Sequence, residues 1–395
     1  MDQSQESELG SLDRLSDLPD ALILEILSLL PSSIRDVVRT TILSKRWKDL
    51  WTTVPRFDFD FCDEDPNFIR GVLAQWKAME KQVKELTVQL KPSMSIEYYA
   101  PQRLYSCLSL TTLSLSYCSI QIEENVQWNQ LRSLTLEHAD SVKVSAVTMN
   151  RILLAAPRLE QLILRPLEVT EDFYIVSASL KFLEIGLGDY DHSVVYAVLG
   201  IWAPNLLLFE FSGDVYGICL LGVPSLTTAT LDFIDEPPPL ETFYQLLWSI
   251  RHVTDLTLSD VCTQLLHEMK EKDMFVQLWN VKFLKVTTSK VDKMLHVLDM
   301  FPQLVTLYAE LNKWSMDQEF DEANTTLSTS SLLHLKTVNI EWYLCDALIL
   351  PFLKTILENA RVLEEIVFRW KGNPEMLPGL PDLWESYQTT DLIFI

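Results

Sequence analysis

The residues that could support catalysis or bind a metal are spaced in ways that favour neither. The histidines show no H-E-x-x-H or other metal-ligand spacing, and no two cysteines lie within three residues of each other. Glycine occurs 10 times, and "GLGDY" from Gly186 lacks the third glycine of a dinucleotide-binding loop. Adjacent acids such as Glu123 and Glu124 are typical of solvated charge. We therefore predict no catalytic residue, no metal site and no cofactor.

Composition predicts a folded, acidic protein that does not bind nucleic acid. Hydrophobic residues make up 48% of the 395 residues, and 55 acidic residues against 32 basic ones give a formal net charge of -23. Such a surface repels a phosphate backbone. The N-terminus lacks the features of a signal peptide, no apolar run is long enough to span a membrane, and the scattered cysteines fit a reducing compartment. We expect a soluble protein of the cytoplasm, the nucleus or both, with no membrane partner.

One hydrophobic pattern, L-x-x-L-x-L or a close variant, recurs along most of the chain. The copies start at Val83, Leu110, Leu131, Leu159, Leu180, Leu206, Leu226, Val253, Val281, Leu304, Leu335 and Leu363. The 280 residues from the first start to the last are covered in 11 steps, with a mean near 25. Two alternating apolar residues in each copy suit a short strand with one buried face. Segments between copies, such as 147–158, 243–252 and 291–303, have helical apolar spacing.

These copies resemble leucine-rich repeats of variable length. The resemblance implies an α/β solenoid with parallel strands on the concave face and helices or irregular segments on the convex face. Residues that flank the buried positions of each strand then lie on the concave face, where repeat proteins bind their partners. The acidic ones are predicted to bind a basic or polar segment of a target protein, with ordinary solvated surface as the alternative: Glu137, Glu184, Glu210, Asp232, Glu310 and Glu341. Arg165, Lys285 and Arg369 are the basic exceptions.

The first fifty residues predict three short helices with more apolar surface than they can bury among themselves. In "LPDALILEILSLLP", Pro19 and Asp20 suit a helix start, and Pro31 ends the helix. Its apolar side chains cover an arc of about 220° at ~100° per residue. "SSIRDVVRTTIL" and "LSKRWKDLW", the latter with Ser44 as N-cap, predict two more helices. A module of about 40 residues is marginal by itself, so its surplus apolar surface predicts a partner protein.

Residues 12–52 closely resemble the F-box, the helical module by which substrate receptors dock onto the Skp-type adaptor of cullin ubiquitin ligases. The resemblance rests on Leu18-Pro19, Ile23, Ile26-Leu27, Leu30-Pro31, Val37, the run from Leu43 to Trp47, and Leu50-Trp51. It implies a Skp-type adaptor as partner and, through the adaptor, a cullin. The implied adaptor-binding residues are Leu18, Pro19, Ile23, Ile26, Leu27, Leu30, Pro31, Val37, Ser44, Trp47 and Trp51. A helical cap that only closes the solenoid is the alternative.

Two further segments resemble parts of plant F-box proteins. Residues 54–65 suit an edge strand that caps the first repeat, and residues 334–368 resemble the FBD module, a strand, a helix opened by Pro351 and a second strand. The predicted organisation is a disordered tail at 1–11, an F-box at 12–54, a connecting segment at 55–82, repeats at 83–333, an FBD-like module at 334–370 and a C-terminal tail at 371–395.

Together the resemblances imply a plant F-box/leucine-rich-repeat protein with a C-terminal FBD-like module. Such a protein is the substrate-recognition subunit of an SCF-type (Skp-cullin-F-box) ubiquitin ligase, and it is not itself an enzyme. The sequence contains neither the cysteine and histidine lattice of a RING ligase nor a domain for a thioester-forming cysteine, so ubiquitin transfer falls to its partners. Two alternatives stay open: a receptor that needs a small-molecule ligand, and a Skp-bound scaffold that degrades nothing.

Overall fold

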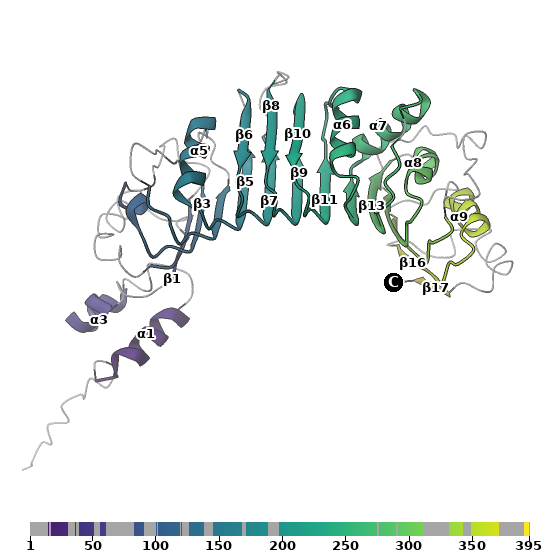
Figure 1. Ribbon diagram of the computed structural model, residues 1–395. Helices are drawn as coiled ribbons and strands as arrows, with labels where there is room; N and C mark the ends of the chain where they lie inside the picture. The colour runs from purple at the N-terminus through teal and green to yellow at the C-terminus, as the bar shows by residue number, and fades with distance from the viewer. Residues whose placement is uncertain are drawn as a thin grey trace, which may run out of the picture. The chain divides into compact units, whose positions relative to one another are not determined.

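The protein is of mixed α/β class, with N-terminal helices followed by a long series of parallel strands, as predicted (Figure 1). The computed structural model describes residues 15, 17–30, 36, 39–50, 56–60, 83–90, 100, 102–118, 120, 126–137, 145–167, 171–188, 197–274, 276–289, 291–311, 332–342, 349–370 and 391–394. The chain divides into two compact units, Met1–Val142 with Ala155–Arg158, and Lys143–Leu154 with Leu159–Ile395. No helix in these described ranges has both the length and the apolar character needed to cross a membrane.

The first unit contains the first and third of the predicted N-terminal helices and the first strands, while half of the segment predicted as the second helix lies outside the described residues. Its helical elements are α1 (Asp20–Leu29), the 3₁₀ turn η1 (Thr40–Ile42), α3 (Lys45–Leu50) and the 3₁₀ turn η4 (Gln102–Ser106). Its strands are β1 (Arg56–Asp60), β2 (Glu85–Gln89), β3 (Thr112–Ser116) and β4 (Ser133–Glu137), which pair in parallel and in chain order. Strand β1 confirms that the segment after the helices adds an edge strand beside the first repeat.

The second unit continues the same repeat. Its large parallel sheet has the order β5-β7-β9-β11-β12-β13-β14-β15-β16-β17. The strands are β5 (Gln161–Leu167), β7 (Phe182–Leu187), β9 (Leu208–Ser212), β11 (Thr228–Asp232), β12 (Asp255–Leu258), β13 (Phe283–Thr288), β14 (Thr306–Leu311), β15 (Thr337–Trp342), β16 (Glu365–Trp370) and β17 (Asp391–Phe394). Because sequential strands are neighbours, each repeat packs against the next one in the chain.

Every predicted copy of the leucine pattern forms a strand. From β2 to β16, each strand of the two large-sheet segments begins two residues after the start of its copy. The first apolar residue of a copy is buried throughout the series, as Leu110 and Leu206 illustrate. The strand residues then alternate between buried and half-exposed positions, as in β3 and β9. This alternation leaves one face of the sheet covered and the other open.

A second layer covers one face of the large sheet in the second unit. It contains a three-stranded parallel sheet of order β10-β8-β6, with β6 (Phe173–Val176), β8 (Val198–Trp202) and β10 (Gly217–Gly222). Strand β10 contacts α6 (Leu240–Ser249), and contacts continue to α7 (Asp260–Glu271), α8 (Val291–Val297) and α9 (Ile349–Asn359). The 3₁₀ turn η5 (Leu298–Met300) follows α8, and α5 (Ala146–Ala155) precedes β5. Helices were predicted in this layer, but the small sheet was not; its strands are short runs of apolar residues.

The C-terminal part departs from the prediction in two places. Strand, helix and strand follow each other as predicted in β15, α9 and β16, but the helix begins at Ile349 instead of Pro351. The segment 371–395 is more than a tail, because its residues Asp391–Phe394 form strand β17 beside β16. A short apolar strand pattern, "DLIFI", is the sequence signal for this last strand. The FBD assignment itself stays a prediction.

Candidate functional site

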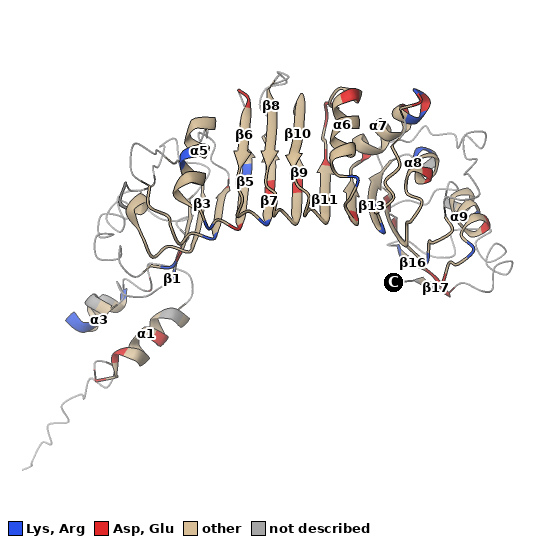
Figure 2. Cartoon of the chain, viewed as in Figure 1, with Lys and Arg blue, Asp and Glu red and all other residues tan. Residues whose placement is uncertain are grey.

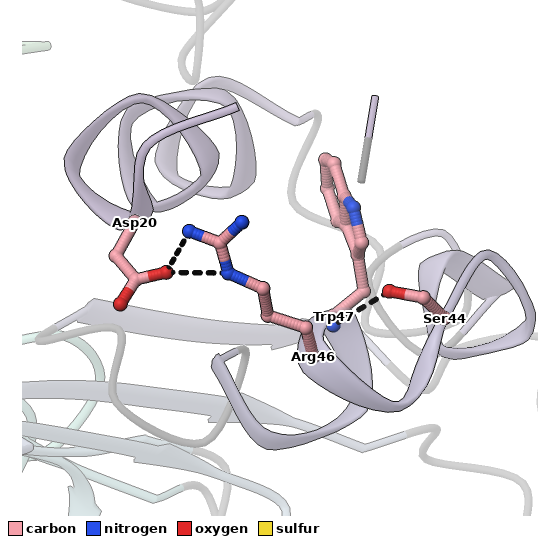
Figure 3. Close-up of polar contacts among 4 residues, drawn as sticks. All are labelled: Asp20, Ser44, Arg46 and Trp47. Atoms are coloured by element: carbon pink, nitrogen blue, oxygen red, sulfur yellow. Dashed lines mark hydrogen bonds and ion pairs between the residues drawn. The ribbon is translucent and has the colours of Figure 1, made fainter. Parts of the chain in front are cut away.

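Helices α1 and α3 form the N-terminal candidate site by burying a small shared core. Ile23 and Leu27 of α1 and Trp47 of α3 are all buried. The Ser44 hydroxyl accepts a hydrogen bond from the backbone N–H of Trp47 at 3.4 Å, which confirms Ser44 as the helix cap. Figure 3 shows Arg46 of α3 reaching to Asp20 at the start of α1, where Arg46 Nε donates to Asp20 Oδ1 at 2.7 Å. These contacts hold the two helices together.

Several large apolar side chains in the described part of this module are exposed. Leu29 of α1 is 76% exposed and Ile42 of η1 is 84% exposed, and Leu15, Leu22 and Leu43 are exposed as well. The buried indole Nε1 of Trp47 also lacks a hydrogen-bond acceptor among the described residues. A buried donor without an acceptor costs about 1–3 kcal/mol. A module with so many open apolar side chains and so small a core is suited to completion by another protein.

The predicted adaptor-binding residues fall into three groups. Those with accessible surface are Leu18, Pro19, Ile26, Leu30 and Ser44, and their contact with an adaptor remains a prediction. Those inside the module are Ile23, Leu27 and Trp47, which support the helices and offer no free surface, so we revise their role. Those outside the described residues are Pro31, Val37 and Trp51. The exposed Leu22, Leu29 and Ile42 were not predicted as contacts, although the wide apolar arc of the first helix contained the signal for Leu22 and Leu29.

The second candidate site lies on the open face of the large sheet. Strand register places Glu184 of β7 directly beside Glu210 of β9, while Asp232 lies beside Ser212 at the end of β11. Figure 2 shows acidic segments on β7 and β9 next to a basic segment on β5. We call Glu184, Glu210 and Asp232 the acidic stripe. All three were predicted from the sequence, and the register brings them onto three consecutive strands.

The acidic stripe is only partly neutralised. Arg165 of β5 forms an ion pair with Glu184, with 2.8 Å between Nη1 and Oε1. Burial and the Glu184 carboxylate raise the pKa of Glu210, while Arg165 lowers it in part. Burial and Asp214 raise the pKa of Asp232, against a lowering by the Ser259 hydroxyl. Raised pKa values mean that negative charge is disfavoured at these carboxylates, so a cationic group from outside would stabilise their ionised forms.

The other predicted acidic residues are engaged within the protein. Glu310 of β14 forms an ion pair with Lys285, with 3.4 Å between Oε2 and Nζ. Glu341 of β15 accepts a hydrogen bond from the Tyr308 hydroxyl. Lys285 and Arg369 also lie 5.2 and 5.7 Å from the centre of the Tyr308 ring. In the first unit, Ser116 donates to Glu137 at 3.4 Å. The open face therefore has balanced charge from β13 to β16 and uncompensated negative charge from β7 to β11.

Cys118 and Cys262 are two of the described cysteines that are buried. Burial raises the pKa of Cys118 to about 12 and that of Cys262 to about 11, so both thiols are protonated at neutral pH and are weak nucleophiles. Across the described part of the chain, no group of three or more histidine, cysteine or acidic side chains is arranged to bind a metal. The geometry of both candidate sites supports binding of another protein.

Comparison with known families identifies both parts of the chain. A profile described as "At1g61320/AtMIF1, LRR domain" matches residues 56–372, and an F-box profile matches residues 15–59. The first match covers well over half of the chain. The chain belongs to the F-box/LRR-repeat proteins. The repeat match includes the predicted FBD-like module at 334–370 and, except for residue 55, the predicted connecting segment at 55–82.

Several F-box/LRR-repeat relatives come from Arabidopsis thaliana. The chain is 30% identical over 259 residues to "F-box/LRR-repeat protein At3g26922", covering 55% of this chain and 82% of the relative. It is 24% identical over 447 residues to "F-box/FBD/LRR-repeat protein At3g26920", covering 98% of this chain and 97% of the relative. A third relative, the F-box/FBD/LRR-repeat protein At4g13965, is 30% identical over 255 residues, and the match spans 55% of this chain and 58% of that protein.

Proposed function

We propose that this protein is the substrate-recognition subunit of an SCF-type ubiquitin ligase. In this proposal the F-box docks on a Skp-type adaptor, which connects it to a cullin, and the repeat sheet binds the target protein. The observation that carries the proposal is the uncovered apolar surface on α1 and η1, within the segment that the F-box profile matches. A cytoplasmic or nuclear location is part of the same proposal.

The adaptor surface is assigned to the exposed and half-exposed side chains of the F-box. Leu22 and Leu29 project from α1 and Ile42 from η1, while Ile23 and Leu27 pack inward. Covering apolar side chains of this size contributes about 1.5–3 kcal/mol each when they become fully buried. A handful of such residues supplies enough apolar contact for a stable interface around polar rim groups.

The target surface is assigned to the acidic stripe on the open face of the sheet. Glu184 and Glu210 lie side by side, Asp232 lies two positions further along the next strand, and the pKa values of Glu210 and Asp232 are raised, which favours a target segment that carries lysine or arginine. Because receptor and ubiquitin carrier are held in one complex, a bound target lysine experiences a high effective concentration of activated ubiquitin. The receptor makes and breaks no covalent bond in this mechanism.

Copurification with a Skp-type adaptor tests the proposal. The full chain is coexpressed with the adaptor as wild type, as Leu22→Asp with Leu29→Asp, and as Leu154→Asp. Leu154 is a matched control, because it is also an exposed leucine on a helix, 83% exposed on α5. We expect at least a tenfold loss of adaptor in the double variant and none in the control. Retained adaptor in the double variant, or failure of the wild type to bind any adaptor, would contradict the proposal.

A further inference from the structure

Two exposed tryptophans lie near the end of the large sheet at which the paired strands β12 and β13 begin. Trp248 is in the last turn of α6, just before β12, and Trp279 is in the turn before β13. Their side chains are 52% and 53% exposed. Tryptophan contributes strongly to binding when it becomes buried, and it is enriched at the centres of protein interfaces. Two such side chains on adjacent repeats therefore indicate a docking surface.

Arg251 connects the two tryptophans. Its guanidinium carbon lies 4.5 Å from the centre of the Trp248 ring, and its Nη1 donates to the Trp248 carbonyl at 2.7 Å. Arg251 and Trp279 occupy equivalent positions, each two residues before the start of its copy of the leucine pattern, and Asn280 Nδ2 donates to the Arg251 carbonyl at 3.1 Å. Because the ring and the hydrogen bond hold the guanidinium in place, its other N–H groups lose little freedom on binding an acceptor. We call Trp248, Arg251 and Trp279 the tryptophan patch.

The turns around the tryptophan patch carry positive charge in a strongly acidic protein. The turns before β12, β13 and β14 span residues 251–254, 278–282 and 301–305. They contain Arg251 and Lys282 but no aspartate or glutamate. Lys282 is exposed, and its backbone N–H donates to the Thr254 carbonyl at 2.8 Å, so the second cation lies beside the β12 turn. Because the whole chain has a formal net charge of -23, an anionic partner is attracted here and repelled by most of the remaining surface.

We propose that the tryptophan patch docks a segment of a partner protein in which an aspartate or glutamate is followed, two residues later, by a large apolar residue. The carboxylate binds the N–H groups of Arg251 within the field of Lys282, and the apolar side chain packs on the exposed ring of Trp279. In an extended segment, residues i and i+2 point to the same side about 7 Å apart, so both reach one surface. The acidic stripe shares no residue with the patch, so the proposal stands independently of the target-binding proposal.

Fluorescence anisotropy with three labelled 12-residue peptides tests this assignment on the full chain. The first peptide repeats leucine-serine-glutamate-serine three times, the second has glutamine in place of glutamate, and the third has serine in place of leucine. We expect saturable binding of the glutamate peptide and at least tenfold weaker binding of the other two. Equal binding of the glutamine peptide would indicate general apolar adhesion, and equal binding of the leucine-free peptide would indicate attraction of charge alone. Either result, or no binding of the glutamate peptide, would overturn the proposal.

Variants then assign the binding to this patch. Arg251→Gln, Trp279→Ser and the charge reversal Lys282→Glu should each weaken binding of the glutamate peptide at least tenfold. The matched controls are Trp202→Ser, at another exposed tryptophan, and Lys354→Glu, at an exposed lysine of α9, and both should leave the affinity unchanged. Full-strength binding by Lys282→Glu, or by a Trp279→Ser protein with a normal melting temperature, would refute the assignment. Sedimentation velocity that showed a wild-type dimer and a monomeric Trp279→Ser protein would make a second copy the occupant, and would also refute it.

Discussion

Single residues in this protein act mainly through pairs formed between neighbouring repeats. Arg165 and Glu184 lie on adjacent strands, and Asp214 accepts hydrogen bonds from the backbone of Ile234 and Asp235 in the next repeat. Exposed ion pairs of this kind contribute up to about 1 kcal/mol each. The larger effect of these contacts is to decide which carboxylates can still bind a partner protein. Glu210 and Asp232 remain available for such a partner.

The histidine pair between α7 and α8 predicts a pH-dependent stability. His267 Nδ1 lies 2.8 Å from His296 Nδ1, so one nitrogen donates while the other accepts, and both cannot carry a proton. Glu271 faces His267 at 3.3 Å, and Lys270 donates to the carbonyl of His296 and pairs with Asp299 at 3.0 Å. Burial, Lys270 and His267 together lower the pKa of His296, against smaller opposing effects of Asp299 and Glu271.

Because the folded chain binds this proton less tightly than the unfolded chain, protonation favours unfolding. Neutral His296 contributes to the free energy of unfolding at pH values above the pKa of histidine in the unfolded chain, about 6.5. This contribution is lost as the pH falls below that value. We expect the melting temperature to fall between pH 7.5 and 5.5, and to fall less steeply in His296→Gln. Thermal unfolding monitored by circular dichroism measures both slopes. His334→Gln, at an exposed position before β15, is the control; identical slopes in wild type and His296→Gln would contradict the assignment.

At the scale of elements, the turn between β9 and β10 depends on one glycine. Gly213 has φ of 114°, in the region that favours glycine, and its N–H donates to the carbonyl of Asp232 at 2.9 Å. A Cβ atom there would lie 2.6 Å from Leu187 Cβ and 3.1 Å from Leu187 N. Since the backbone of the preceding repeat blocks the space, the chain has to shift to accept a side chain.

Gly213→Ala should therefore destabilise the protein by about 1–3 kcal/mol, the range for a residue held in an unfavourable backbone conformation. Urea unfolding monitored by tryptophan fluorescence measures the midpoint of the transition. Gly217→Ala is the matched comparison, because its Cβ would meet the Cγ2 of Val198 at 3.1 Å without a positive φ. A midpoint for Gly213→Ala as high as that for Gly217→Ala would show that the turn tolerates a side chain.

At the scale of the whole molecule, binding functions are assigned to separate parts of one chain. The F-box contacts are assigned to residues before 52, and the target contacts to strands β7, β9 and β11. Since repeat proteins are stabilised mainly by contacts between adjacent repeats, a surface change on these strands has little effect on a helical module elsewhere in the chain. Loss of one binding function should therefore leave the other intact.

Charge reversal of the acidic stripe tests this separation. Glu184→Lys with Glu210→Lys and Asp232→Lys should retain the adaptor on copurification but lose captured target proteins, because the negative potential that attracts them is reversed. Quantitative mass spectrometry of the copurified proteins measures both. The control variant reverses three exposed helix residues, Glu241, Glu268 and Glu358. If the stripe variant captures every protein that the wild type captures, the target surface lies elsewhere.

The strand positions of the repeat were predictable from the sequence because their signal is local. Each copy of the leucine pattern places its buried apolar residues within six residues of sequence. Every copy packs against neighbouring repeats that present similar apolar side chains. The first and third helices of the F-box were predictable for the same reason, since their start residues and apolar spacing lie within each segment. The small sheet and β17 were missed, because short apolar strands without a repeating context do not differ clearly from irregular segments.

The sequence by itself determined that the chain is an acidic α/β repeat protein with an apolar helical module at its start. Only the tertiary structure decided which apolar residues of that module are covered, because Ile23 and Leu22 are neighbours in the chain and only Ile23 is buried. It also decided which acidic residues stay without a partner, since the pairing of Arg165 with Glu184 depends on the lateral register of strands about twenty residues apart. Contacts between residues so far apart in the sequence are set by the packing of the strands, and a local sequence pattern does not predict them.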